Sequence, residues 1–410
     1  MSRDLARDIG RDIGRDMGRE QAATATLWTH IRAGHGPTAR RVDDVVSDSS
    51  LVLGRGGVDA AAARLSSEVL GAGPLDPLLA REDVTDVLVN GTAGVWIDSG
   101  AGLTRADCEL GDEEKVRRLA VRLAGLARRR LDEASPYVDG LLPGGVRLHA
   151  LLPPLVDGGA HISLRIPRRR VSSLAQLQAA GAFPQEWTQV LAAIVAGRHS
   201  FVVSGGTGSG KTTLLAALLA GVEVGERIVV VEDVRELAVV HPHTVRLQTR
   251  PANVEGSGHV DMVALVRQSL RMRPDRLVVG EVRGAEVREM LSALNTGHEG
   301  GCGTIHANSS VDVVTRFEAL GALADMSPEA TRTQLGSALS VVIHLRRHHG
   351  HRYVESIGVL TRDGGDLRVC PALTQPAPEP GRPGPSTLAQ CVAEPGWSRL
   401  AALLDAGSRG

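Results

Sequence analysis

The chain has 410 residues, of which 42% are hydrophobic and 23% are charged, and its formal net charge is −1. This is the composition of a globular protein, and the length favours two folded domains with additional tails. The near-neutral charge argues against a nucleic-acid-binding protein, and an aromatic content of 2% leaves few side chains for stacking on single-stranded bases.

The cysteine content and the lengths of the apolar runs indicate the cellular compartment. The 4 cysteines show no C-x-x-C spacing, which disfavours a structural zinc site and fits a reducing compartment. The first residues are charged, unlike a signal peptide, and no apolar run reaches the roughly 18 residues that a membrane span needs. We therefore expect a cytoplasmic protein whose contact with a membrane is peripheral.

Residues 1–50 are expected to form a flexible tail. An Arg-Asp repeat over residues 3–18 would place apolar side chains in a slowly drifting stripe on a helix. Gly10, Gly14 and Gly18 weaken such a helix by about 1 kcal/mol each relative to Ala. A frayed tail or a misplaced start is therefore favoured over a weak docking helix.

Residues 51–167 are expected to form an α+β domain. Residues 83–90 are rich in β-forming side chains, and a glycine turn leads to a second strand at 95–97, which predicts a hairpin. Residues 113–130 have the spacing of an amphipathic helix, whose arginine-rich end suits the negative end of the helix dipole. Further short strands are expected between 141 and 166.

A polar linker at 168–173 separates this domain from the next one. From residue 174 to residue 370, short apolar strands alternate with helical stretches, which is typical of a parallel sheet in an α/β domain. Residues 371–410 begin with a proline-rich spacer and end in a segment that can form a short docking helix.

The strongest motif is Gly-Gly-Thr-Gly-Ser-Gly-Lys-Thr at 205–212, which fits the Walker A pattern G-x-x-x-x-G-K-[ST]. An apolar strand precedes it, and leucines at helical spacing follow it. Such a loop points backbone N–H groups at phosphate oxygens, and the next helix offers its positive end to the anion. Lys211, which with Lys115 makes up all the lysine of an arginine-based chain, would reach the β- and γ-phosphates, and Thr212 would bind Mg²⁺. The predicted nucleotide-binding residues are Gly205, Gly206, Thr207, Gly208, Ser209, Gly210, Lys211, Thr212 and Thr213.

Two carboxylates are expected at the ends of neighbouring strands. Glu232 ends one apolar strand, and Glu281 follows another that starts at Arg276. Ligands of such sheets lie at the carboxyl ends of the strands, so both side chains are expected to face the γ-phosphate. One would orient and deprotonate the attacking water, and the other would hold Mg²⁺ through water. Gly280 stands where most P-loop proteins have Asp, which shifts metal coordination toward Thr212 and water.

Residues 295–308 form a glycine-rich segment that contains His298 and His306. No carboxylate or cysteine spacing supports metal binding by these imidazoles, so a polar loop that senses the γ-phosphate is favoured. A structural role stays open, above all for His298.

Together these motifs resemble the type II/type IV secretion ATPases, and most closely the TadA/CpaF branch. The resemblance rests on a Walker A loop at 205–212, an acidic box at 231–237, a Walker B stretch at 270–284 and a histidine box that ends at Asn308. N-terminal signatures of the family are matched at 73–79, 87–91 and 151–155, and the whole resemblance covers roughly residues 51–369. A four-cysteine zinc insert of some relatives is absent, and Gly300-Gly301-Cys302 replaces their usual Gly-Ser pair and larger residue.

The resemblance implies a fold, partners and residue roles. A RecA-like motor domain would follow a smaller α+β domain, and ATP with Mg²⁺ would bind between them. A hexamer would drive a platform protein at the cytoplasmic face of the plasma membrane. Glu232 would be the catalytic carboxylate and Glu281 the Walker B carboxylate. The arginines that would neutralise phosphate charge, some across a domain or subunit boundary, are Arg147, Arg165, Arg246 and Arg250.

The preferred hypothesis is an ATP-hydrolysing motor for pilus assembly or protein secretion. A conjugation-associated ATPase is the alternative, although the net charge gives no expectation of direct nucleic-acid binding. The intact Lys211, Thr212, Glu232 and Glu281 argue against a ring subunit that binds ATP and only scaffolds. Nothing in the sequence resembles the substrate lid of a small-molecule kinase.

Overall fold

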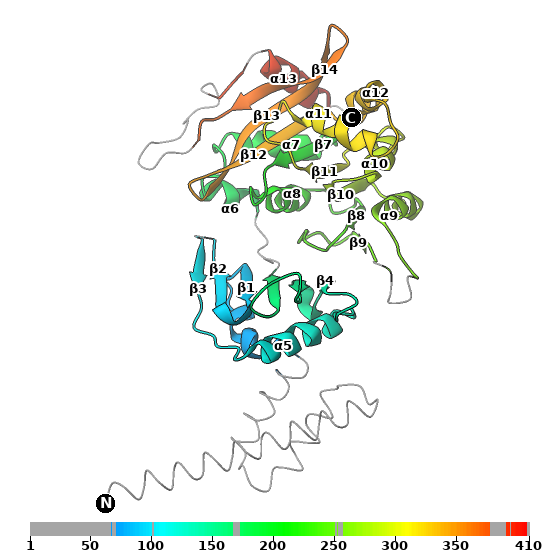
Figure 1. Ribbon diagram of the computed structural model, residues 1–410. Coiled ribbons are helices and arrows are strands. Elements are labelled where there is room, and N and C mark those ends of the chain that lie inside the picture. Colours follow the sequence, from blue (N-terminus) through cyan, green and yellow to red (C-terminus); the bar gives the residue numbers. More distant parts are fainter. Residues whose placement is uncertain are drawn as a thin grey trace, which may run out of the picture. The chain divides into compact units, whose positions relative to one another are not determined.

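The computed structural model describes residues 67, 71–100, 102–166, 173–250, 252, 257–377, 391–393 and 395–407 (Figure 1). The chain divides into two compact units, residues 1–167 and 168–410. The expected tail at 1–50, most of the linker at 168–173 and much of the proline-rich spacer lie outside the described residues.

The N-terminal unit is built on a 6-stranded antiparallel sheet in the order β3-β2-β1-β6-β5-β4. Its strands are β1 (Asp86–Asn90), β2 (Val95–Asp98), β3 (Leu103–Arg105), β4 (Tyr137–Leu141), β5 (Arg147–Leu151) and β6 (His161–Arg165). Short helical segments occupy Gly73–Leu75, α4 (Asp76–Leu79), Gly91–Ala93 and Pro143–Gly145. The predicted hairpin is confirmed, because β1 and β2 pair in antiparallel register around the turn at Gly91–Ala93.

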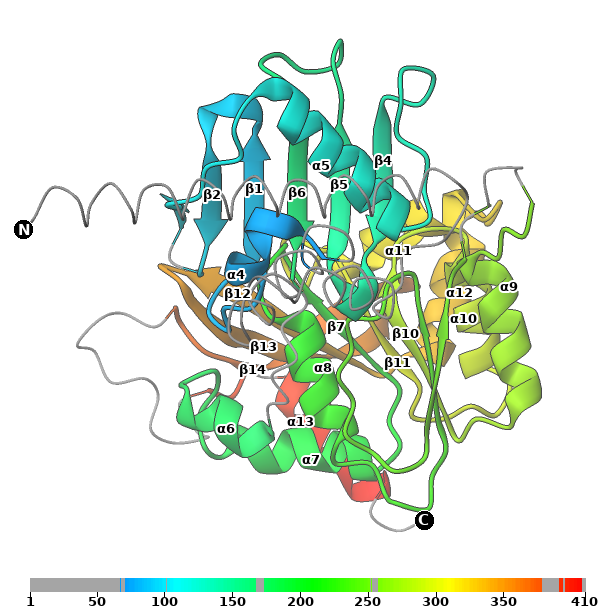
Figure 2. The same ribbon diagram turned by 90° about the horizontal axis from the view of Figure 1, so that it is seen from below.

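Helix α5 (Glu113–Leu126) lies across one face of this sheet (Figure 2). It begins where the Asp112 side chain accepts a hydrogen bond from the Lys115 N–H at 2.9 Å, which is a standard N-cap. Apolar side chains at helical spacing, such as Val116 and Leu123, are fully buried against the strands. This burial confirms the amphipathic face that the sequence predicts.

The same helix ends at Leu126 and not at Arg130, which corrects the predicted boundary. Arg128 takes a left-handed φ of 56°, and the Arg129 N–H bonds to the carbonyl of Ala124 at 2.8 Å. This is a Schellman-type ending, which closes the last turn before the arginines. The guanidinium groups of residues 128–130 therefore follow the helix and do not form its last turn.

The C-terminal unit contains an 8-stranded sheet in the order β14-β13-β12-β7-β11-β10-β8-β9. Neighbours from β12 to β9 pair in parallel, whereas β13 and β14 add antiparallel pairs at one edge. The strands are β7 (Phe201–Gly205), β8 (Ile228–Glu232), β9 (Thr244–Gln248), β10 (Arg276–Val282), β11 (Cys302–Ile305), β12 (Val341–His348), β13 (His351–Asp363) and β14 (Asp366–Thr374). The continuous apolar runs predicted for β7, β8 and β10 are buried because helices cover both faces.

Helices pack on the two faces of this sheet and build two cores (Figure 2). One face carries α6 (Leu174–Ala179), α7 (Trp187–Ala196), α8 (Lys211–Leu219) and α13 (Gly396–Gly407). The other carries α9 (Met262–Ser269), the turn Leu270–Met272, α10 (Glu286–Leu294), α11 (Val313–Ala322) and α12 (Pro328–Ala338). Strand residues alternate between the cores, so that Phe201 and Val203 pack in the first and Val202 in the second.

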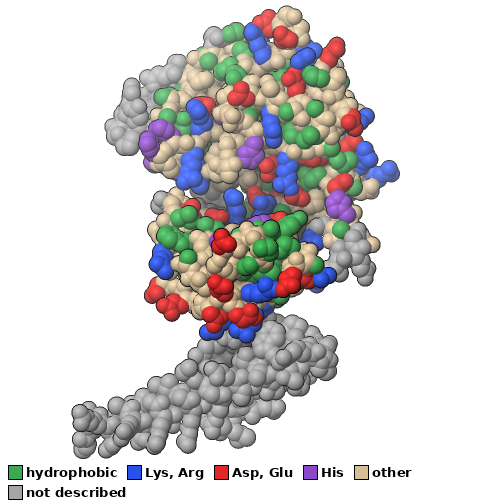
Figure 3. All heavy atoms as spheres, viewed as in Figure 1, with side chains coloured by type: hydrophobic (Ala, Val, Ile, Leu, Met, Phe, Trp, Pro, Cys, Tyr) green, Lys and Arg blue, Asp and Glu red, His purple; other side chains and the backbone are tan. Residues whose placement is uncertain are grey.

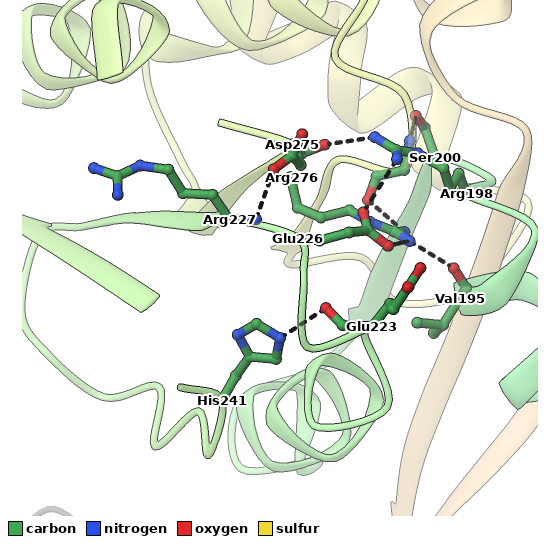
Figure 4. A network of polar contacts seen from close by, with 10 residues as sticks. Val195, Arg198, Ser200, Glu223, Glu226, Arg227, His241, Asp275 and Arg276 are labelled. Atoms are coloured by element: carbon green, nitrogen blue, oxygen red, sulfur yellow. Dashed lines mark hydrogen bonds and ion pairs between the residues drawn. The ribbon is translucent and has the colours of Figure 1, made fainter. Parts of the chain in front are cut away.

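A buried ion pair fastens the amino ends of β8 and β10 (Figure 4). Nε and Nη2 of Arg276 donate to the two carboxylate oxygens of Glu226 at 2.7 and 2.8 Å. Nη2 also donates to the Val195 carbonyl at 2.9 Å, so the pair reaches the end of α7. A Cβ on Gly300, whose φ is +74°, would lie 2.3 Å from Nη1 of this arginine, so the first glycine of the Gly-Gly-Cys sequence is required by packing.

The C-terminal segment adds to this unit beyond the predicted boundary at residue 370. Strand β14 continues to Thr374, and Pro371 lies at an irregularity in its pairing with β13 at the sheet edge, where a missing N–H is tolerated. Helix α13 packs on the first core through Trp397 and the buried Leu400. The docking helix expected near the C-terminus is thus present in the described residues.

These features confirm the predicted fold class: a RecA-like P-loop α/β unit preceded by a smaller α+β unit. The helices of the described residues include none with the length and apolar composition that a membrane span requires. Basic and acidic side chains are interspersed on the face of the described residues that Figure 3 shows.

Candidate nucleotide-binding site

The phosphate-binding loop connects the end of β7 to the start of α8. Gly208 and Gly210 have φ values of +71° and +98°, which side-chain-bearing residues rarely adopt. A Cβ on Gly205 would lie 2.4 Å from the carbonyl oxygen of Leu345 on β12. The loop therefore lies against its neighbouring strand, and its glycines are needed for both its shape and its packing.

Lys211 is buried at the first position of α8 and faces back into the loop. Its Nζ donates hydrogen bonds to the carbonyls of Gly205 and Gly206 at 3.0 and 2.9 Å. Burial lowers the pKa of this ammonium to about 8, although the carboxylates of Glu281 and Glu236 oppose the shift. An anion bound in the loop would favour the charged form of Lys211.

His306 connects this lysine to Glu281. Its imidazole Nε2 lies 3.3 Å from Lys211 Nζ and 3.1 Å from Oε1 of Glu281. Burial, followed by the charge of Lys211, lowers the pKa of His306, so the neutral imidazole is favoured near neutral pH. The three side chains thus form a contact chain across the carboxyl ends of β7, β11 and β10.

Glu232 ends β8 and is buried, with every carboxylate oxygen in a hydrogen bond. Oε1 accepts from the backbone N–H groups of Glu236 and Leu237 at 2.8 and 2.7 Å, and Oε2 accepts from Nη2 of Arg246 at 3.1 Å. A Cβ on Gly280 would lie 2.7 Å from the Cγ of Glu232. The glycine at the usual aspartate position therefore makes room for this glutamate.

A pocket of about 580 Å³ opens beside the start of the loop. Sequence reasoning singled out Gly206 and Thr207 in the loop and the histidine box with His306, Ala307 and Asn308, and it missed the contribution of the segment from 312 onward. The missed lining residues are Asp312, Thr315, Arg316 and Ala319. Arg316 is close enough to His306 to disfavour its protonation. An arginine on an amphipathic helix gives no sequence signal of this placement.

The remaining loop residues are positioned by the start of α8. Thr212 is half-buried in its first turn, and Thr213 is exposed. Ser209 is buried and donates from its hydroxyl to the Gly206 carbonyl at 2.9 Å. The described residues contain no cluster of His, Cys, Asp and Glu that could hold a metal by itself.

The four predicted arginines are not gathered at one place. Arg246 contacts Glu232, whereas Arg250 is exposed and donates from Nε to the Gly258 carbonyl at 2.6 Å. Arg147 and Arg165 belong to the N-terminal unit, where β5 and β6 place them directly opposite each other. The structure thus assigns Arg246 to the nucleotide-site edge of the sheet and Arg250 to the loop that follows β9.

The two histidines of the glycine-rich segment lie at opposite ends of β11. His298 precedes the strand, and its Nδ1 lies 3.1 Å from the carbonyl oxygen of Ala293 near the end of α10. This placement does not support the predicted sensor role for His298, because the strand separates it from the loop. Cys302 is a core residue, and burial raises the pKa of its thiol to about 12.

His344 on β12 is a buried polar residue that sequence reasoning did not select. Its Nδ1 lies 2.9 Å from the Ser204 hydroxyl, directly before the loop, and its Nε2 lies 3.8 Å from Glu355. Burial lowers the pKa of this imidazole. A histidine within the apolar run Val-Val-Ile-His-Leu was the available signal.

Comparison with known proteins agrees with this geometry. The profile of the family described as Type II/IV secretion system protein matches residues 68–362. A Mycobacterium tuberculosis protein named "Putative conjugal transfer protein" is 52% identical over 312 residues, which are 74% of this chain and 89% of that protein. The type IV secretion system protein PtlH of Bordetella pertussis is 31% identical over 322 residues, with coverages of 71% and 94%. The crystal structure of the VirB11 ATPase of Brucella suis shares 25% identity, covers 69% of this chain and 91% of its own, and has a TM-score of 0.36. On the family profile and the two sequence relatives, the chain belongs to the type II/IV secretion ATPase superfamily.

Proposed function

We propose that this chain is an ATP-hydrolysing motor that powers pilus assembly or protein secretion. The contact chain from Lys211 through His306 to Glu281 carries the proposal, because it links the phosphate loop to a carboxylate on the next-but-one strand. Glu232 lies on the adjoining strand β8. A phosphate loop, a buried carboxylate and a polar residue between them are the parts that nucleotide hydrolysis requires.

The residues present fit a Mg-nucleotide. The loop glycines leave a cradle that side chains would fill, and Thr212 and Glu281 supply the oxygen ligands that Mg²⁺ prefers. The Thr212 hydroxyl would bind the ion directly, and Glu281, whose side chain is 40% exposed, would bind it through water. The metal would offset charge on the phosphate oxygens.

Glu232 is the proposed catalytic carboxylate. The two amide hydrogen bonds fix Oε1, so Oε2 is the oxygen that can orient a water and take its proton. Nη2 of Arg246 donates a hydrogen bond to the same Oε2. This arginine is therefore proposed to position the carboxylate of Glu232 and to neutralise phosphate charge.

His306 is the proposed sensor of the γ-phosphate. A phosphate oxygen attracts an ammonium more strongly than a carbonyl does, so Lys211 would leave the Gly205 and Gly206 carbonyls for it. His306 would then lose its lysine neighbour and keep its contact with Glu281. The contacts of His306 at the carboxyl ends of β11 and β10 would thereby differ between the states with and without the terminal phosphate.

The partners follow from family membership and are part of the proposal. We propose a homo-hexamer that acts on a platform protein at the cytoplasmic face of the plasma membrane. Arg147 and Arg165, together with Arg250, are the proposed phosphate or subunit-boundary arginines. Work on protein partners agrees with a net charge of −1, which gives the chain no overall positive charge to attract nucleic acid.

A conjugation-associated motor is the second candidate, since the Mycobacterium tuberculosis relative is named for conjugal transfer. Deletion of the gene separates the two: loss of surface filaments or of a secreted protein supports the first candidate. Loss of DNA transfer with filaments and secretion intact supports the second.

Phosphate release from the full chain with Mg-ATP tests the enzymatic proposal. We expect slow turnover in the wild type and none in Lys211→Ala. Glu232→Gln should lose turnover by about 10²-fold or more and still bind nucleotide, because the amide keeps its Oε1 acceptor. Glu289→Gln is the control, because it removes a carboxylate of helix α10 that pairs with Arg267, and it should turn over normally. A wild type without turnover, even with membranes or a platform-protein fragment, would favour a scaffold.

A further inference from the structure

The β12–β13 hairpin places cationic side chains beside the phosphate loop. Residues 346–352 read Arg-Arg-His-His-Gly-His-Arg, and His349 and Gly350 form the turn with positive φ values. The strand register sets Arg347 directly opposite Arg352. Like charges at directly opposite positions of a hairpin are destabilising, so a hydrogen-bond acceptor beside these two arginines would stabilise the end of the hairpin.

The phosphate loop supplies such an acceptor through a backbone carbonyl. Nε of Arg352 donates a hydrogen bond to the Gly208 carbonyl at 2.8 Å. A Cβ on Gly210 would lie 3.3 Å from Cδ of Arg352, and a Cβ on Gly208 would lie 3.7 Å from Nη1 of Arg347. Both arginine side chains therefore lie along the second half of the loop, on the β12 side of β7, and not on the side of β11 and Glu281.

The hydrogen bond from Arg352 sets the orientation of one peptide plane in the loop. In a trans peptide, the Gly208 carbonyl and the Ser209 N–H point in opposite directions. Because Arg352 holds the carbonyl outward, the Ser209 N–H points inward, toward the Gly206 carbonyl at 3.4 Å. Inward N–H groups of such a loop are the donors that hold phosphate oxygens.

We propose that Arg352 is a positioning residue of the nucleotide site, which fixes the loop in its phosphate-binding form, and that Arg347 adds a second positive charge beside the bound phosphates. The ligand class is a nucleoside di- or triphosphate, because the backbone N–H groups of a loop with this pattern cradle the α- and β-phosphates, which ADP and ATP share. This inference rests on the proposed nucleotide site, and it assigns the hairpin to binding and not to the chemical step.

Direct binding of ADP and of Mg-ATP to the full chain, together with steady-state hydrolysis, tests the inference. In Arg352→Gln we expect the Kd values of both nucleotides to rise about tenfold, the effect of losing one charge-assisted hydrogen bond. The kcat at saturating ATP should stay near the wild-type value. Arg352→Lys should recover part of the affinity, because an ammonium can still donate to Gly208. Arg347→Gln should raise Kd by about threefold, the effect of removing one positive charge near the bound phosphates.

Arg368→Gln is the matched control, because it removes an exposed hairpin arginine at the other end of β13, where Arg368 pairs with Asp363. It should bind both nucleotides as the wild type does. Wild-type affinity in Arg352→Gln would overturn the inference, and so would a loss of kcat with unchanged Kd. A loss of affinity that Arg352→Lys does not relieve and that comes with a lower melting temperature would also overturn it. If the wild type binds nucleotide without hydrolysing it, only the motor proposal fails; if it binds none, both fail.

Discussion

The parallel strands of the C-terminal unit have an arginine–glutamate pair at each of their two ends, and the two pairs differ in burial and in hydrogen bonding. We call the amino ends of these strands the amino edge and their carboxyl ends the carboxyl edge. At the amino edge, Arg276 is 1% exposed and meets Glu226 through two hydrogen bonds. At the carboxyl edge, the Arg246 side chain is 32% exposed and meets Glu232 through one contact at 3.1 Å. The first guanidinium also bonds to backbone carbonyls, whereas Nε of the second is buried without a hydrogen-bond partner among the described residues. The comparison indicates that the amino-edge pair stabilises the fold, whereas the carboxyl-edge contact can break and re-form where nucleotide is proposed to bind.

The largest expected effect is at the amino edge. Arg276→Ala leaves the carboxylate of Glu226 without its buried partner and with only the more exposed Arg198 beside it, and we expect the free energy of unfolding of the C-terminal unit to fall by about 3 kcal/mol. The guanidinium of Arg276 lowers the pKa of Glu226, so the pair stabilises the fold at neutral pH and loses this effect as pH falls through that pKa. Urea denaturation at pH 7 and at pH 4 measures both.

Arg198→Gln is the control for this prediction, because its half-exposed guanidinium lies 3.4 Å from the same Glu226. Its loss should cost less than about 1 kcal/mol. A double replacement, Arg276→Met with Glu226→Leu, should restore much of the stability that Arg276→Ala loses. If Arg276→Ala lowers the free energy of unfolding no more than Arg198→Gln does, the pair of Arg276 and Glu226 does not stabilise the fold in the way proposed.

Adding a methyl group at Gly280 tests whether the position of Glu232 at the carboxyl edge matters for turnover. In Gly280→Ala the new Cβ would be 2.7 Å from the Cγ of Glu232, so this carboxylate must move. We expect a stability loss of about 1–3 kcal/mol from overpacking. ATP turnover should fall by about 10²-fold, as for removal of a general base. Gly358→Ala is the control, since its Cβ would meet Val369 at 2.8 Å, away from the site. Normal turnover in folded Gly280→Ala would remove Glu232 from the mechanism.

The pH dependence of ADP binding gives an effect of intermediate size at the same edge. Burial lowers the pKa of Lys211 to about 8, and a bound phosphate favours the ammonium. ADP affinity should therefore be constant below pH 8 and fall by up to about tenfold per pH unit above it. Calorimetry between pH 7 and pH 10 measures this, and Lys211→Arg, which stays charged, should show no such fall. A flat wild-type profile would mean that Lys211 does not meet the phosphates.

The same linkage acts on folding with the opposite sign. In the unfolded chain Lys211 has its ordinary pKa of 10.5, whereas the folded chain holds it near 8. Between these values the unfolded state binds more protons, so the contribution of Lys211 to stability rises with pH. Weaker ADP binding above pH 8 is therefore not explained by unfolding through this group.

The comparison also shows which parts of the molecule could be predicted from sequence. The strands, the phosphate loop, Glu232 and Glu281 follow from contiguous patterns, because a buried parallel strand is a run of apolar residues and its ligands lie at its carboxyl end. Arg276 could not be selected in this way. It stands among exposed arginines at 271 and 273, and its partner Glu226 is 50 residues away.

Other site residues were missed or misplaced for the same physical reason. The contact from Arg352 to Gly208 spans 144 residues and depends on the strand order β12-β7, which the sequence pattern does not specify. His298 and His306 look equivalent in a glycine-rich segment. The short strand β11 between them sends one to each edge of the sheet. Local patterns predicted elements, and the contacts between distant elements decided which side chains meet.

Arg246→Gln gives the smallest expected change in stability and completes the comparison. The contact with Glu232 is single and its arginine is partly solvated, so the free energy of unfolding should change by less than about 1 kcal/mol. The kcat for ATP should still fall about tenfold or more, because a charge that supports phosphoryl transfer is lost. Urea denaturation and phosphate release on the same preparation measure the two effects. A stability loss as large as that of Arg276→Ala, with kcat unchanged, would make both pairs structural. The arginine that serves the phosphates would then have to be sought among Arg147, Arg165 and Arg250.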